Sequence, residues 1–98
     1  MYARVTTVQL QPGVADDLTQ YLQDTVVPAA KQAKGFGGIQ ILVNPATNMG
    51  IAITFWDSEA DMAAGEASSG YYSQALAGGA RFFAGQPMRE TYDVRIKE

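Results

Sequence analysis

Two tyrosines, one carboxylate and the single tryptophan are the side chains of this sequence with the clearest potential for chemistry. Tyr21 and Tyr72 carry phenolic hydroxyls that could donate a hydrogen bond to a ligand. Glu66 could accept a proton, and Trp56 could form the flat wall of a ligand cavity. Histidine and cysteine are absent from the chain. Imidazole and thiolate catalysis, disulfides and the usual zinc sites are therefore excluded, and any reaction must use carboxylates, Tyr, Lys, Arg or the ligand's own reactivity.

Each of these side chains also has a purely structural interpretation. Tyr72 could be a core tyrosine bonded to a backbone group, and Tyr21 is a similar but weaker candidate. Trp56 could cover the end of a strand and pack across a subunit interface. Glu66 could be a solvated helix residue, and it becomes a candidate base only if burial raises its pKa.

The acidic residues of "DSEAD" (Asp57 to Asp61) favour a helix start over a metal site. Ser58 followed three residues later by Asp61 resembles a capping box, and acidic residues in the first turn complement the helix dipole. We therefore expect no metal. A phosphate-binding loop is not predicted either, because the glycine cluster "KGFGG" (Lys34 to Gly38) has the wrong spacing and follows a helix.

Length and composition indicate one globular domain that spans residues 1–98. Apolar residues make up 47% of the chain, which suffices for a single core. The net charge of −3 argues against nucleic-acid binding. No apolar segment reaches the roughly 20 residues that span a bilayer, and the first residues do not resemble a secretion signal. We expect no membrane association and a cytoplasmic location.

Periodicity predicts the order β-α-β-β-α-β. Alternating or β-branched runs indicate strands, whereas apolar residues at intervals of three and four indicate helices. A kink is expected at Pro28, whose missing N–H cannot bond the carbonyl of Asp24. The expected strands are Tyr2–Gln11, Gly38–Asn44, Met49–Trp56 and Met88–Glu98, and the expected helices are 14–34, 59–67 and 71–83. This order predicts an α+β, ferredoxin-like antiparallel sheet with its helices on one face.

The strand Met49–Trp56 has one bulky face and one smaller face. Met49, Ile51, Ile53 and Phe55 alternate with Gly50, Ala52, Thr54 and Trp56. We expect the bulky side to face the helices and Trp56 to lie on the other face of the sheet. Because a wide apolar sheet face is rarely left in water, we also expect a homodimer in which two sheets pack together and bury Trp56.

The chain resembles the antibiotic biosynthesis monooxygenase-like domains of the dimeric α/β-barrel superfamily. The resemblance covers nearly the whole chain and implies a dimeric α/β barrel. Four segments carry it: "VTTVQLQPGVADDL" (Val5 to Leu18), "VVPAAKQAKGFGG" (Val26 to Gly38), "ITFWDSEADMAAGEAS" (Ile53 to Ser68) and "YYSQALAGGARFFAGQP" (Tyr71 to Pro87).

Heme-degrading members of this superfamily are the less compatible branch. Matched through "QPG" and "FWDSE", their first-strand Asn, second Trp and iron-ligating His fall here at Thr6, Glu66 and Leu76. All three residues differ, so heme degradation by that route is disfavoured. The match still implies that Thr6, Glu66 and Leu76 lie near a cavity between the sheet and the later helix.

Two functions of different classes are compatible with the sequence: the family resemblance implies the first, and the lack of any residue set that compels catalysis motivates the second. The first is a cofactor-independent monooxygenase that oxidises a small aromatic, quinol- or anthrone-like substrate with dioxygen. Such an enzyme needs an apolar cavity, hydrogen-bond donors for the developing oxyanion, and a base or water. The alternative is a non-catalytic dimeric module that binds a small hydrophobic metabolite or serves regulation or assembly. The substrate-pocket candidates are Thr6, Tyr21, Trp56, Glu66, Tyr72 and Leu76, and the sequence assigns no catalytic residue.

Overall fold

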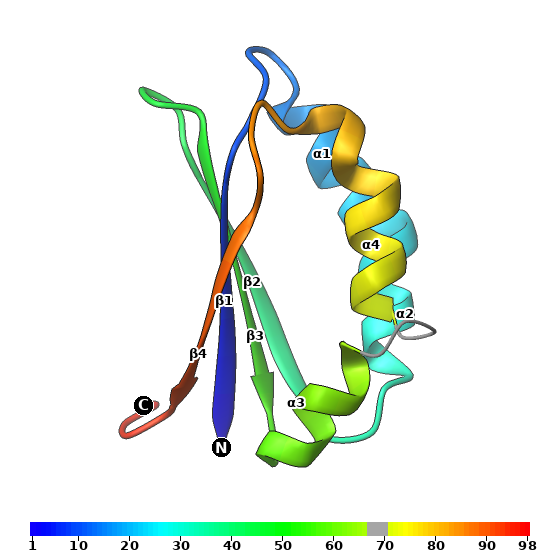
Figure 1. Cartoon of the computed structure of the whole chain (residues 1–98), viewed down its shortest axis with the longest axis vertical. Coiled ribbons are helices and arrows are strands. Elements are labelled where there is room, and N and C mark those ends of the chain that lie inside the picture. Colours follow the sequence, from blue (N-terminus) through cyan, green and yellow to red (C-terminus); the bar gives the residue numbers. More distant parts are fainter. Residues whose placement is uncertain (67–70) are drawn as a thin grey trace.

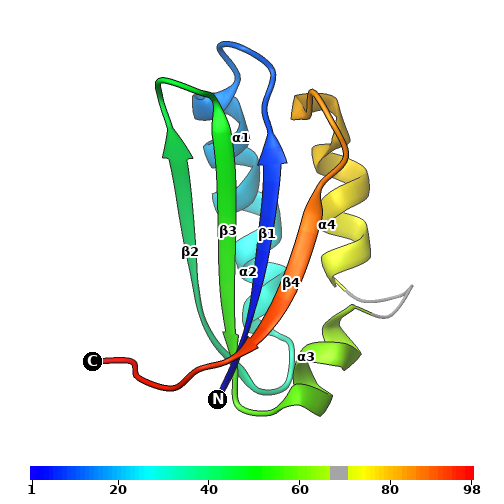
Figure 2. The ribbon, with the colours of Figure 1, turned by 60° about the vertical axis from the view of Figure 1, so that its left-hand side comes forward.

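The computed structural model describes residues 1–66 and 71–98, which form two layers: a four-stranded sheet and the helices that cover one of its faces (Figure 1). The strand order is β2-β3-β1-β4, and every neighbouring pair is antiparallel (Figure 2). The strands are β1 (Tyr2–Gln9), β2 (Phe36–Asn44), β3 (Met49–Trp56) and β4 (Met88–Asp93). The predicted β-α-β-β-α-β order and the α+β, ferredoxin-like class are confirmed.

The pairing register determines which side chains face the helices. Arg4, Thr6 and Val8 of β1 are buried in the single chain. Their partners on β3 are Thr54, Ala52 and Gly50, and paired residues of an antiparallel sheet point to the same side. The helix-covered face of β3 therefore carries Gly50, Ala52, Thr54 and Trp56.

This placement contradicts the predicted orientation of β3. The bulky residues lie on the face that the helices leave uncovered, and these are Met49, Ile51, Ile53 and Phe55. The small residues lie beneath the helices. Bulk alone was a poor guide, because small side chains under the helices leave room between the two layers.

Trp56 is completely buried within one chain, at 0% exposure. Its ring meets Phe36 edge-on with centroids 5.6 Å apart, and its indole N–H donates to Thr54 Oγ1 at 3.0 Å. The prediction that Trp56 reaches the opposite face and depends on a dimer for burial was wrong. Strand pairing places it opposite Tyr2 and Phe36 on the helix-covered side.

A wide helical turn directly before Pro28 interrupts the first helical segment. It comprises α1 (Ala15–Tyr21), the π-helical turn η1 (Leu22–Val26) and α2 (Val27–Lys31). The N–H of Val27 bonds to the carbonyl of Leu22, five residues back. Pro28 then falls in the first turn of α2, directly after this wide turn. Gly35 follows at a φ of 78°, as expected for a left-handed position after a helix.

The second helical segment comprises α3 (Glu59–Gly65), α4 (Tyr71–Gly79) and the 3₁₀ turn η2 (Ala80–Phe82). Ser58 caps α3 by accepting a hydrogen bond from the N–H of Asp61 at 3.1 Å, which confirms the predicted helix start. The expected end of this helix at residue 67 lies outside the described residues. No helix among those described is both long enough and apolar enough to span a membrane.

The last strand is shorter than predicted. β4 ends at Asp93, and the remaining residues cross the foot of the sheet (Figure 2). The N–H of Val94 bonds to the carbonyl of Met1 at 2.9 Å, and Lys97 Nζ lies 5.1 Å from the centre of the Phe55 ring. This contact brings the C-terminal segment to the uncovered face of the sheet.

Candidate functional site

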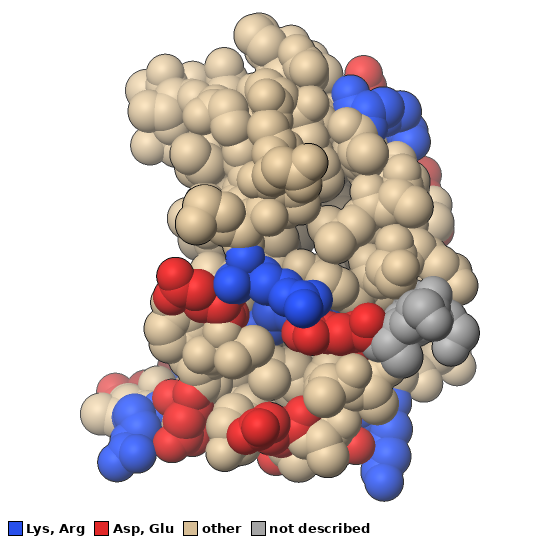
Figure 3. All heavy atoms as spheres, in the orientation of Figure 1, with Lys and Arg blue, Asp and Glu red and all other residues tan. Residues whose placement is uncertain are grey.

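A cavity of about 100 Å³ lies between the sheet and the helices and is partly open to solvent. Side chains of β1, β2 and β3 form one wall, and side chains of α1, η1 and α4 form the opposite wall. In the space-filling view (Figure 3), uncharged side chains cover most of the upper part of this side of the molecule, and charged groups form a band across the lower part. The site is therefore an apolar space beside a charged region.

Small residues on β3 create this space. Ala52 lies in a row between Thr6 of β1 and Ile41 of β2, and all three line the cavity. Gly50 is closely packed, because a Cβ added there would lie 3.3 Å from Leu10 Cδ1. The region near Leu10 is thus filled, whereas the row of Ala52 remains open.

Two hydroxyl groups form a polar feature of the cavity wall. Thr6 Oγ1 and Tyr72 Oη lie 3.2 Å apart in a buried hydrogen bond between β1 and α4. One hydroxyl donates to the other, and the acceptor keeps its own proton. The Thr6–Tyr72 pair therefore holds one hydroxyl hydrogen that this bond does not use. The structural interpretation of Tyr72 predicts a hydrogen bond from its hydroxyl to a backbone group. The observed partner is the side chain of Thr6 in the cavity wall.

Tyr21 contributes its ring to the cavity and its hydroxyl to the fold. Tyr21 Oη donates to the carbonyl of Ala75 at 3.1 Å and connects α1 to α4. Gly78 lies against the same hydroxyl, so a side chain there would collide with it. Tyr21 is consequently engaged as a helix-to-helix contact, in line with its structural interpretation.

Arg4 was not among the residues predicted for the site. It lines the cavity, although its side chain is only 1% exposed. Its Nη1 lies 2.9 Å from Glu66 Oε1 and 3.5 Å from the carbonyl of Met62, and its Cζ lies 3.9 Å from the centre of the Tyr72 ring. A buried guanidinium carries a large desolvation cost unless it is paired, and these contacts offset that cost.

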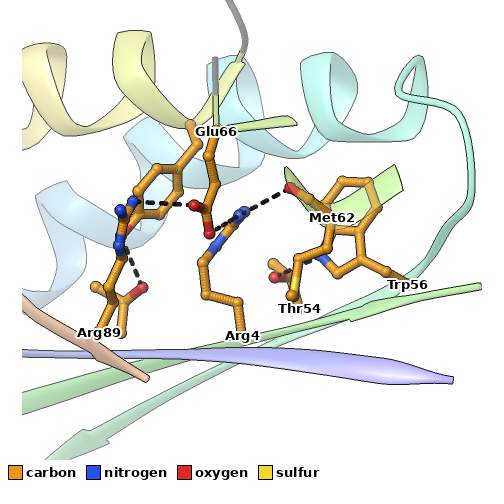
Figure 4. Close-up of polar contacts among 8 residues, drawn as sticks. Arg4, Thr54, Trp56, Met62, Glu66 and Arg89 are labelled. Carbon is orange, nitrogen blue, oxygen red and sulfur yellow. Dashed lines mark hydrogen bonds and ion pairs between the residues drawn. The ribbon is translucent and has the colours of Figure 1, made fainter. Parts of the chain in front are cut away.

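Glu66 lies between two arginines. Its Oε1 pairs with Arg4, and its Oε2 lies 3.3 Å from Nη1 of Arg89 on β4 (Figure 4). The Glu66 side chain is 20% exposed and the Arg89 side chain is 51% exposed. The three groups together carry a net charge of +1, formed by two guanidinium cations and one carboxylate.

The sequence-predicted candidates divide into two groups. Thr6, Tyr21, Tyr72 and Leu76 line the cavity. Glu66 and Trp56 do not line it, but Glu66 pairs with Arg4, and the Trp56 ring centre lies 5.7 Å from Arg4 Cζ. A signal for Arg4 was present in the sequence, since it stands two residues before Thr6 and so shares its face of the strand.

Solved structures with the same fold come from several bacteria. A monooxygenase of Streptomyces coelicolor in complex with nanaomycin D superposes with a TM-score of 0.83 at 13% identity, over 99% of this chain and 89% of that one. A candidate antibiotic biosynthesis monooxygenase of Bordetella bronchiseptica gives 0.81 at 14% identity, over 97% of each chain. The chain has the fold of the antibiotic biosynthesis monooxygenase-like proteins. A Nitrosomonas europaea protein of unknown function also has this fold, with a TM-score of 0.78 at 17% identity over 99% of this chain and 91% of that one.

Two sequence relatives are named as uncharacterised proteins. Proteins from two strains of Mycobacterium tuberculosis are 31% identical to this chain over 97 residues, which is 98% of this chain. The chain spans only 39% of the length of these relatives. No protein-family model matches the sequence. At these levels of identity, the solved structures establish only that the chain has the fold of the antibiotic biosynthesis monooxygenase-like proteins. Its activity must be inferred from the residues of the site.

Proposed function

We propose that this protein is a cofactor-independent monooxygenase that oxidises a small aromatic, quinol- or anthrone-like substrate with dioxygen. The observation that carries this proposal is the apolar cavity with the Thr6–Tyr72 hydroxyl pair and Arg4 in its wall. An apolar space suits an aromatic ring and excludes water, and the polar groups suit an oxygen atom that gains negative charge during the reaction. The S. coelicolor neighbour, named a monooxygenase, supports the assignment by its fold.

The proposed reaction takes place at a CH2 carbon, which an anthrone has and which a quinol has in its keto tautomer. It removes both hydrogens of that carbon and inserts one oxygen atom. An acidic C–H bond loses its proton to water or a base, and the resulting carbanion adds dioxygen to form a peroxide. Loss of the second C–H proton and cleavage of the O–O bond leave a carbonyl on that carbon and release the other oxygen as water. The protein must hold the ring, stabilise the oxyanion conjugated to the carbanion, and exclude bulk water.

Thr6 and Tyr72 have the role of oxyanion donors in this proposal. Their shared hydrogen bond leaves one hydroxyl hydrogen for the substrate oxygen. Loss of one donor of this kind typically lowers the rate about 10²- to 10³-fold. Oxygen uptake should be measured with a panel of quinols and anthrones under air, with anaerobic controls. Tyr72→Phe and Thr6→Val should each lower turnover, whereas Tyr92→Phe, an exposed tyrosine outside the cavity, should leave it unchanged. Failure of every substrate in the panel to cause oxygen uptake would refute the enzyme assignment.

A non-catalytic metabolite-binding module is the second candidate, and one observation favours it. Among the described residues that line the cavity, none is a carboxylate, so the structure supplies no side-chain base of that kind there. Ligand binding with no oxygen-dependent turnover would support this candidate over the first. A regulatory or assembly role belongs to the same alternative.

The homodimer remains a proposal, now based on different residues. The face that the helices leave uncovered carries Ile51, Ile53 and Phe55 on β3, and the neighbouring strands add the exposed Leu42, Met88 and Tyr92. A contiguous apolar surface of this kind is typical of a subunit interface. Light scattering after size exclusion should give twice the mass of the chain, and a stable monomer at micromolar concentration would contradict the dimer. The cytoplasmic location likewise remains part of the proposal.

A further inference from the structure

The cavity has one charged end. Among the described residues that line it, Arg4 alone carries a charge. Thr6 follows Arg4 by two residues on the same face of β1, and its hydroxyl is bonded to that of Tyr72. Both hydroxyls therefore lie beside this end. A ligand that lies in the cavity therefore meets hydrocarbon along most of its length and a cationic group at one end.

The local charge at this end is positive. Among the described residues, the ionisable and charged groups near it are Arg4 on β1, Arg89 on β4, Glu66 after α3 and Tyr72 on α4. Tyr21, from α1, bonds to the backbone of α4. With two cations and one carboxylate, the cluster retains one positive charge, and Arg4 is its most buried member. A cation in a poorly hydrated site attracts an anionic oxygen more strongly than it would in water.

The volume of the cavity limits the size of the ligand. About 100 Å³ is available, which is less than the roughly 150 Å³ of an engineered protein cavity that accommodates benzene. A single aromatic ring can still bind if its far edge occupies the partial opening. A second fused ring exceeds the enclosed volume.

We infer that the cavity binds a single-ring phenol or quinol as its anion, with the phenolate oxygen at the Arg4 end. This inference rests on the proposed function in one respect, because it takes the same cavity as the substrate site. The substrate class is thereby narrowed from quinols and anthrones to monocyclic phenolates. Glu66 moderates the binding, because its carboxylate competes with the phenolate for Arg4.

Spectrophotometric titration of the purified full chain with 4-nitrophenol tests this inference, since the phenol and phenolate forms absorb differently. Nitrobenzene is the matched neutral probe, and 4-nitro-1-naphthol adds a second ring. Wild-type protein should move the half-ionisation of bound 4-nitrophenol at least about one pH unit lower, which corresponds to about a tenfold preference for the anion. The two-ring probe should bind at least about tenfold more weakly than 4-nitrophenol.

Variants assign this preference to Arg4. Arg4→Met should lower phenolate affinity about 10- to 100-fold, the range of one charge-assisted hydrogen bond, and should leave nitrobenzene binding nearly unchanged. Arg89→Met is the matched control, because it removes a guanidinium that pairs with the same carboxylate but is half exposed and does not line the cavity. This control should keep the preference for the anion. Glu66→Gln should strengthen phenolate binding.

Four results would overturn the inference: no binding of any probe by wild-type protein, equal binding of the phenol and phenolate forms, tighter binding of the two-ring probe, or an unchanged preference in Arg4→Met. Arg4→Met could fail to fold because Glu66 loses its partner. In that case the double variant Arg4→Met/Glu66→Gln, which leaves no unpaired carboxylate, is used in place of the single variant. Phenolate binding does not depend on oxygen uptake. Anion binding without turnover would therefore refute the proposed enzyme activity but not the binding of a phenolate. Turnover of neutral ligands without a preference for the anion would refute phenolate binding but not the enzyme activity.

Discussion

Ala52→Ile should stabilise the protein and abolish its ligand binding. Ala52 is in the central strand β3 and faces the cavity between Thr6 and Ile41. Isoleucine suits a strand and adds apolar atoms in this space. Filling all of the 100 Å³ at about 24 cal/mol per Å³ of cavity would contribute at most about 2 kcal/mol. Isoleucine fills only part of it, so we expect about 1 kcal/mol, or about 4 to 8 °C in Tm for a domain of this size.

Two assays on the same variant test this reasoning. Thermal unfolding followed by circular dichroism gives the change in Tm, and titration with 4-nitrophenol gives the change in affinity. Ala29→Leu is the control, because Ala29 is exposed on α2 and its replacement adds apolar atoms outside the cavity. Unchanged affinity in Ala52→Ile would show that ligands bind elsewhere. A loss of stability greater than about 1 kcal/mol would indicate overpacking, and hence that the space is already filled.

Three further substitutions test the packing around the site. Trp56→Phe removes the indole N–H that bonds to Thr54 Oγ1 and leaves a void in a fully buried position. The free energy of unfolding, measured with urea, should fall by about 1 to 3 kcal/mol. An unchanged urea midpoint would contradict the burial of Trp56. Ser58→Ala removes the cap of α3 and should cost about 1 kcal/mol in the same assay, whereas no loss would mean that the cap is not formed in solution. Gly78→Ala should destabilise the protein although alanine favours helices, because its Cβ collides with the Tyr21 hydroxyl. A gain in stability there would argue against the contact between α1 and α4.

The order of the elements was predictable from the sequence because local signals determine it. The period-2 alternation of Met49 to Trp56 defined β3 with its observed bounds, and Ser58 marked the start of the next helix. The side of β3 that faces the helices was not predictable from bulk. The bulky side remains uncovered in the single chain, and the small side forms the cavity.

Arg4 shows why the site could be predicted only in part. Thr6, Tyr72 and Leu76 were identified through helix periodicity and the family resemblance, and they line the cavity. Arg4 looks like an ordinary charged residue of a strand until Glu66, 62 positions later in the chain, comes within 2.9 Å of it. The period of the strand indicates that Arg4 shares the face of Thr6, but it does not indicate the ion pair with Glu66, which only the folded arrangement reveals.

Isotope labelling tests the central claim most directly. A monocyclic quinol that causes oxygen uptake should be incubated with the protein under dioxygen labelled with the heavy oxygen isotope, and the product analysed by mass spectrometry. The proposed reaction predicts one labelled oxygen atom per product molecule and one in water, with incorporation that falls strongly in Tyr72→Phe. A product whose new oxygen comes from water, or equal incorporation with and without the protein, would contradict the assignment as a monooxygenase.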